Sequence, residues 1–163
     1  MLQNKEYQMR SNFLVRRLRL ADLDRILEIE HACFRKDAYS RKLFAEYARE
    51  CGEYFLVARR GAGTAAHRAV IWGYILTCPC RGEAELVSVA VDPASRGEGA
   101  ASALMDSTLR RLKRHGVARL TLTVRVTNRR ALRFYEKYGF AKVKLVRGYY
   151  EDGQDGWRMA KPL

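Results

Sequence analysis

Arg96-Gly97-Glu98-Gly99-Ala100-Ala101 stands between an apolar run and a helix-forming stretch, and this segment decides the fold. The preceding residues 85–91 are rich in β-branched side chains and predict a strand, which Asp92-Pro93 ends. Downstream, apolar residues recur at helical spacing from Ala101 to Leu112. The predicted order is therefore strand, glycine loop and helix.

The glycine loop has the features of an anion site. Glycines at 97 and 99 let the backbone approach a ligand, and the unpaired N–H groups of a first helical turn favour negative charge, so a diphosphate fits. The dinucleotide fingerprint needs a third glycine where Ser102 stands, and the P-loop needs Gly-Lys-Ser/Thr, so neither pattern matches. A plain turn without a ligand is the alternative.

A second block begins at Asn128, after a strand-like run at residues 120–126, and reads Asn-Arg-Arg-Ala-Leu-Arg-Phe-Tyr-Glu-Lys-Tyr-Gly-Phe. An Arg-x-x-Gly-x-Ala loop followed by Asn-x-x-Ala-x-x-Phe-Tyr-x-x-x-Gly-Phe resembles the Gcn5-related N-acetyltransferase superfamily. The resemblance extends from Val15 to Met159. It implies acetyl-CoA as co-substrate and a primary amine as acetyl acceptor.

The periodicity predicts an α/β domain with a mixed sheet of six to seven strands and helices on both faces. The expected strands are residues 15–18, 54–59, 70–78, 83–91, 120–126, 141–146 and 157–160. The expected helices are residues 23–34 with Asp22 as cap, 40–51, 99–115 and 128–138, the last ended by Gly139. Residues 61–68 form a hairpin loop, and the resemblance implies that the parallel fourth and fifth strands splay apart.

Length and charge limit the class of protein. A chain of 163 residues is one ordinary domain, here 1–163 with residues 1–12 frayed, and it carries 31 Lys and Arg against 18 Asp and Glu. The charge of +13 attracts polyanions such as RNA or the ribosome, although a solvated basic face is an equal alternative. No signal peptide or membrane span is visible, so we expect a cytoplasmic monomer or homodimer.

The four cysteines do not have the spacing of a zinc site, and we expect no metal. Cys33, Cys51, Cys78 and Cys80 are interpreted as reduced thiols. A covalent nucleophile at Cys78 or Cys80 is a weaker alternative, because no histidine or acid flanks either residue at a suggestive spacing.

Acetyl transfer to an amine needs a base, because amines are protonated near neutral pH. Glu85 is the candidate, since strand alternation places it with Val87, Val89 and Val91 on an apolar face, where burial raises the pKa of a carboxylate. It also matches the general-base glutamate in the fourth strand of histone-type superfamily members. The alternatives are an exposed glutamate or one paired with an arginine.

Tyr135 is the candidate acid. Asn128, Ala131, Leu132 and Tyr135 share one helix face, where the small Ala131 leaves room for a pantetheine arm. The resemblance implies that the Tyr135 hydroxyl lies near the CoA sulfur and that Asn128 contacts the pantetheine. A buried aromatic hydrogen-bonded to the backbone is the alternative.

The resemblance is strongest to protein N-terminal acetyltransferases, including the ribosomal-protein alanine type. That type has a base glutamate in the fifth strand, where this chain has Thr123, so Glu85 would have to substitute. The implied cofactor residues are Val89, Ala90, Val91, Arg96, Gly97, Glu98, Gly99, Ala100, Ala101, Ser102, Asn128 and Tyr135. The implied acceptor residues are Phe34, Tyr39, Tyr149 and Tyr150, for which core packing is the alternative.

The favoured acceptor is therefore a protein or peptide α-amine. Two rival interpretations remain. One is a small-amine acetyltransferase for a metabolite or antibiotic, although a basic enzyme should repel polyamines. The other is a non-catalytic basic module that binds RNA or the ribosome and retains CoA.

Overall fold

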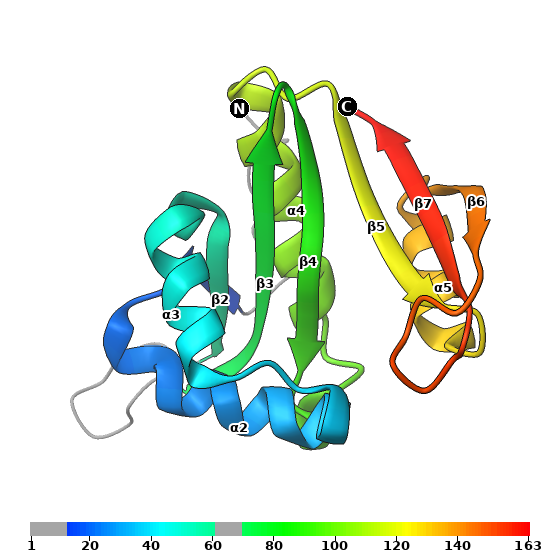
Figure 1. Cartoon of the computed structure of the whole chain (residues 1–163). Helices are drawn as coiled ribbons and strands as arrows, with labels where there is room; N and C mark the ends of the chain where they lie inside the picture. Colours follow the sequence, from blue (N-terminus) through cyan, green and yellow to red (C-terminus); the bar gives the residue numbers. More distant parts are fainter. Residues whose placement is uncertain (1–12, 61–69) are drawn as a thin grey trace. The chain divides into compact units, whose positions relative to one another are not determined.

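The computed structural model describes residues 13–60 and 70–163, and these form a seven-stranded sheet with the order β1-β2-β3-β4-β5-β7-β6 (Figure 1). The strands are β1 (Phe13–Arg17), β2 (Phe55–Arg60), β3 (Val70–Cys80), β4 (Glu83–Val91), β5 (Arg119–Arg125), β6 (Ala141–Val146) and β7 (Gly156–Pro162). The α-helices are α2 (Leu23–Phe34), α3 (Arg41–Glu50), α4 (Ala100–Arg114) and α5 (Arg129–Lys137). Every strand and α-helix expected from the sequence is present.

Four short 3₁₀ helices were not predicted, because single turns carry no periodicity. They are η1 (Leu20–Asp22), η2 (Arg35–Asp37), η3 (Gly52–Tyr54) and η4 (Pro93–Ser95). The predicted frayed residues 1–12 and the predicted loop at residues 61–68 lie outside the described residues.

The chain divides into two compact units, Met1–Cys78 with Ser88–Arg111, and Pro79–Val87 with Leu112–Leu163. In the first unit β2 and β3 pair antiparallel, as the predicted hairpin requires, with Phe55 opposite Leu76, and β1 pairs antiparallel with β2. The rings of Phe44, Phe55 and Tyr74 pack against one another and are fully buried. Figure 1 shows α3 in front of β2 and α4 behind β3.

In the second unit β7 pairs antiparallel with both β5 and β6, which places the last strand inside the sheet. β4 and β5 are parallel, as predicted. Their ladder comprises Glu83–Glu85 opposite Arg119–Thr121, although β4 runs to Val91 and β5 to Arg125.

Side-chain caps explain where two helices begin. Ser40 accepts a hydrogen bond from the Leu43 amide at the start of α3 (3.2 Å), and Asn128 accepts from the Ala131 amide at the start of α5 (3.1 Å). Asp22 stands at the N-cap position of α2, as predicted, but its side chain makes no capping hydrogen bond to the helix. Its carboxylate instead accepts hydrogen bonds from the Arg16 side chain and the Arg19 amide, because η1 intervenes.

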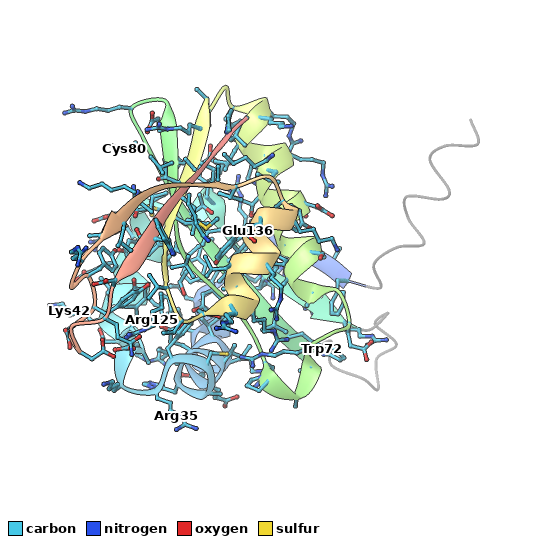
Figure 2. The ribbon with its side chains drawn as sticks, turned by 90° about the vertical axis from the view of Figure 1, so that its right-hand side faces the viewer. Arg35, Lys42, Trp72, Cys80, Arg125 and Glu136 are labelled. Atoms are coloured by element: carbon cyan, nitrogen blue, oxygen red, sulfur yellow. A yellow bond between two sulfur atoms is a disulfide. The ribbon has the colours of Figure 1, made fainter. Side chains whose placement is uncertain are left out.

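The prediction of four reduced cysteines is wrong for two of them. Cys51 and Cys78 form a disulfide with their Cα atoms 5.3 Å apart, whereas Cys33 and Cys80 are free thiols. The reason is the β2–β3 register. Phe55 pairs with Leu76. Cys51, four residues before Phe55, and Cys78, two residues after Leu76, therefore come together at one end of the hairpin. Cys80, labelled in Figure 2, is exposed.

The α-helices are short, and the longest, α4, has 15 residues. In the part of the chain that the structure describes, no helix is long and apolar enough to cross a membrane.

Candidate active site

The glycine loop lies between η4 and α4 in the first unit. Gly97 and Gly99 have φ angles of +83° and +94°, which disfavour any residue with a side chain. A Cβ atom built on either glycine would meet nothing within 4 Å, so the space beside the loop is open. The N-terminus of α4 directly follows this loop, and a helix N-terminus favours an anion. This arrangement fits the diphosphate expected from the sequence.

Arg96 connects the loop to α2. Its guanidinium contacts the Cys33 sulfur at 3.4 Å, and the Cys33 thiol donates to the Val91 carbonyl at 3.3 Å. Burial is the main reason that the pKa of Cys33 is raised, which favours the neutral thiol. Val89 and Val91 lie on one half-buried face of β4, as the alternation predicts, and Ala90 lies buried on the other.

Glu98 places a negative charge in a loop that suits an anion. Arg60 pairs with it, with Nη1 and Oε2 3.0 Å apart. The same guanidinium lies over the ring of Trp72, labelled in Figure 2, at 4.8 Å and over Phe13 at 5.8 Å. The two rings therefore hold the cation that offsets the charge of Glu98.

We predict that Arg60→Ala weakens CoA binding about three- to tenfold, because an unpaired Glu98 carboxylate would repel a diphosphate bound at the glycine loop. The effect is modest because both side chains are partly exposed to solvent. Glu98→Gln should strengthen binding, and the double variant should behave like Glu98→Gln alone. Titration calorimetry with CoA measures the three dissociation constants. The control is Arg59→Ala, which removes the neighbouring cation of β2. An effect of Arg60→Ala that persists in the double variant would contradict this coupling.

Asp92 directly follows β4 and precedes the loop, and its Oδ2 accepts a hydrogen bond from the guanidinium of Arg25 in α2. Its other carboxylate oxygen accepts a hydrogen bond from the Ala94 amide at 3.0 Å, and Arg25 also donates to the Ile71 carbonyl at 3.1 Å. The hydrogen bond from Arg25 is the main reason that the pKa of Asp92 is lowered. Asp92 thus joins α2 to the strand that precedes the loop.

A lowered pKa makes this contact sensitive to acid. The contribution of Asp92 to stability is complete above its unfolded-state pKa of about 3.9 and is lost as the pH falls through the lower folded-state pKa. We predict that the free energy of unfolding falls more steeply with acidification in the wild type than in Asp92→Asn. Urea unfolding at a series of acidic pH values measures both curves, and parallel curves would contradict the prediction.

Glu85 lies in the second unit and is not buried, contrary to expectation. Its side chain is 46% exposed and pairs with Arg158 of β7, with Oε1 and Nη1 2.8 Å apart. Arg158 also donates to the hydroxyls of Thr123 (3.2 Å) and Thr121 (3.0 Å). One guanidinium therefore joins the candidate base Glu85 to Thr123, the position where the sequence resemblance implied a glutamate. The face that Glu85 shares with Val87 is half-buried because Ala84 and Leu86 occupy the core side.

Tyr135 is buried in α5, with 7% of the residue exposed. Its ring packs on Phe134 and Phe140, with centroids 5.6 and 5.7 Å away. Burial, assisted by the charge that Tyr150 can carry, raises the pKa of Tyr135 far above its ordinary value. Asn128 is at the exposed start of the same helix.

The candidate acceptor residues are aromatic side chains, two in each unit. In the first unit Phe34 ends α2, and the half-buried Tyr39 packs on the ring of Phe44, 5.7 Å away. In the second unit Tyr149 and Tyr150 lie in the β6–β7 connection with their rings 5.0 Å apart. Tyr149 is 50% exposed, which argues against core packing for that side chain. The guanidinium of Arg125, labelled in Figure 2, lies 3.9 Å from the Tyr150 ring.

Two residues near these positions were missed. The sequence around Arg158 did not indicate a functional role, because the partners of Arg158 depend on the register of β5 against β7, in which Thr123 pairs with Arg158. The position of Glu30 could have been noticed from the sequence, since a carboxylate on the apolar stripe of α2 needs a buried partner. Glu30 is 1% exposed and binds Tyr74 and the Tyr39 amide.

Comparison with known proteins decides the family. The model of the acetyltransferase (GNAT) family matches residues 23–140. The chain belongs to this family. It is therefore an acetyltransferase, as the two sequence blocks indicated.

Relatives of this GNAT acetyltransferase cover nearly its whole length. It is 32% identical over 158 residues to an N-alpha-acetyltransferase of Saccharolobus solfataricus, covering 93% of this chain and 94% of the relative. The Ard1 structure from Thermoplasma volcanium superposes with a TM-score of 0.85 at 27% identity, covering 93% and 98% of the two chains. The ribosomal-protein-S18-alanine N-acetyltransferase from Escherichia coli gives a TM-score of 0.75 at 30% identity, covering 92% and 93%.

Proposed function

We propose that this enzyme transfers the acetyl group of acetyl-CoA to the α-amino group of a protein or peptide in the cytoplasm. The observation that carries the proposal is the 32% identity to an N-alpha-acetyltransferase over nearly the full length of both chains. The similarity to the ribosomal-protein-S18-alanine enzyme supports the same class of acceptor. The net charge of +13 disfavours polyamines as acceptors and favours acidic partner surfaces, including the ribosome.

The glycine loop is the proposed site for the diphosphate of acetyl-CoA. Its left-handed glycines, the open space beside them and the N-terminus of α4 support this assignment. The proposed contacts to the pantetheine arm are the backbone of residues 89–91 and the side chain of Asn128. When bound, acetyl-CoA supplies an activated thioester.

Glu85 is the proposed base for the reaction. It would take a proton from the acceptor ammonium, directly or through a water, so that the nitrogen can form the C–N bond as the C–S bond breaks. The proposed role of Tyr135 is to donate a hydrogen bond to the departing sulfur. Because burial raises the pKa of Tyr135 well above the value of about 8.5 typical of a thiol, complete proton transfer to the thiolate is disfavoured.

The proposed acceptor residues are Phe34, Tyr39, Tyr149 and Tyr150. Their support is the resemblance to N-terminal acetyltransferases together with the exposure of Tyr149. Aromatic side chains provide large contact areas with little loss of conformational entropy, which suits the binding of a peptide N-terminus.

Mass spectrometry of peptide and small-amine libraries incubated with enzyme and acetyl-CoA tests the proposal. We expect the added mass on the α-amino group of peptides, located by fragmentation. Blocking the N-terminus of the same peptides should abolish the product, while replacing their lysines should not. Acetylation confined to lysine side chains or to small amines would overturn the proposed acceptor.

A further inference from the structure

Glu30 is a carboxylate in the interior of the first unit. It lies on the stripe of α2 that also carries Ile26 and Ile29, and all three side chains are at most 1% exposed. A buried carboxylate costs free energy unless hydrogen bonds satisfy its oxygens. Its position therefore calls for a role that an apolar residue would not provide.

The two carboxylate oxygens bind different parts of the unit. Oε1 accepts a hydrogen bond from the backbone amide of Tyr39 at 2.8 Å. Oε2 accepts from the hydroxyl of Tyr74 in β3, and that hydroxyl is 2.8 Å from the Ser88 Oγ of β4. Glu30 thus connects the segment between α2 and α3 to two strands of the sheet.

The connected segment is the one that carries a proposed acceptor residue. It leaves α2 through Arg35, which has a positive φ of 49°, and passes through η2 to Ser40. The ring of Tyr39 is fixed by Phe44, and Phe44 packs in turn on Tyr74 at 5.5 Å. The backbone of Tyr39 is therefore connected to the buried Tyr74 through Glu30, and the ring of Tyr39 is connected to it through Phe44.

We propose that Glu30 is a positioning residue that holds the backbone of Tyr39 in the conformation that receives the peptide N-terminus. This inference rests on the proposed function, because that function gives Tyr39 its role. Glu30 acts through the segment and need not contact acetyl-CoA. Its loss should therefore affect peptide binding and leave the cofactor unaffected.

The test is steady-state kinetics of Glu30→Met with a peptide acceptor. A hydrogen bond to a carboxylate is worth about a ten- to hundredfold change in an equilibrium, so the KM for peptide should rise by roughly that factor. The KM for acetyl-CoA should not change. Glu30→Gln should restore most of the peptide affinity, since its amide oxygen can accept from the Tyr39 amide while its NH₂ donates to Tyr74.

The control is Glu28→Gln, which alters an exposed glutamate on the same helix and should have no effect. Glu30→Asp provides a second variant if Glu30→Met fails to fold, because it keeps the charge but is too short to span both partners. Unchanged peptide KM, or an equal rise in both KM values, would overturn the inference.

Hydrogen exchange at the Tyr39 amide separates this inference from the proposed function. The amide should exchange about ten- to hundredfold faster in Glu30→Met whether or not any peptide is acetylated. Unchanged exchange would refute the role of Glu30. Faster exchange in an enzyme that acetylates no peptide would instead refute the assignment of the acceptor.

Discussion

Glu85→Gln should lower kcat by about a hundred- to ten-thousandfold, the range that general-base catalysis contributes. Glutamine has the same shape as glutamate but cannot take a proton from the acceptor ammonium. The KM for acetyl-CoA should stay unchanged, because the proposed cofactor contacts lie on other residues. Steady-state kinetics with a peptide acceptor measures both constants, and an unchanged kcat would exclude Glu85 as the base.

Glu85→Gln also breaks the ion pair with Arg158, and this could lower kcat without any role in proton transfer. Two further variants separate the two explanations. Glu83→Gln breaks the equivalent pair between Glu83 and Arg119, which are 3.1 Å apart in the same ladder, and should leave kcat unchanged. Arg158→Gln removes the partner of Glu85 but keeps its carboxylate. If Arg158→Gln reproduces the full loss of Glu85→Gln, orientation of the pair and not proton transfer explains the result.

Tyr135→Phe should lower kcat by about a hundredfold, the cost of removing one hydrogen-bond donor from a developing negative charge. The ring still packs on Phe134 and Phe140, so the melting temperature and the affinity for CoA should not change. Rapid-mixing kinetics of thiol release gives the rate of the chemical step, and calorimetry gives the affinity.

The control for Tyr135 is Tyr138→Phe, which removes a hydroxyl from the same segment while the ring keeps its contact with Phe134. Its kcat should equal that of the wild type. Normal turnover in Tyr135→Phe would remove this hydroxyl from the mechanism.

Local patterns predicted the elements of the fold well. Strand alternation placed Glu85 and Val87 on one face of β4, and the helical spacing from Asn128 to Tyr135 predicted α5. Gly139 was expected to end this helix in the left-handed conformation, and its φ is +85°. Each of these features depends on neighbours within a few residues, which the sequence shows directly.

The partners of the site residues could not be predicted, because they depend on strand register. Arg158 reaches Glu85 from a strand 73 residues later in the chain, and Tyr74 reaches Glu30 from 44 residues away. No local sequence pattern indicates contacts between residues so far apart in the chain. The burial expected for Glu85 was wrong for a different reason, since alternation gives the two faces of a strand but not which one the core covers.

Because Cys51 and Cys78 form a disulfide, the stability of a purified sample depends on whether the buffer contains a reductant. The disulfide joins residues 27 apart, and a cross-link of that size stabilises a folded chain by about 3–4 kcal/mol by restricting the unfolded ensemble. Dithiothreitol in a purification buffer would therefore yield a preparation that melts at lower temperature. Activities measured with and without reductant should be compared only after the thiol content of each sample has been titrated.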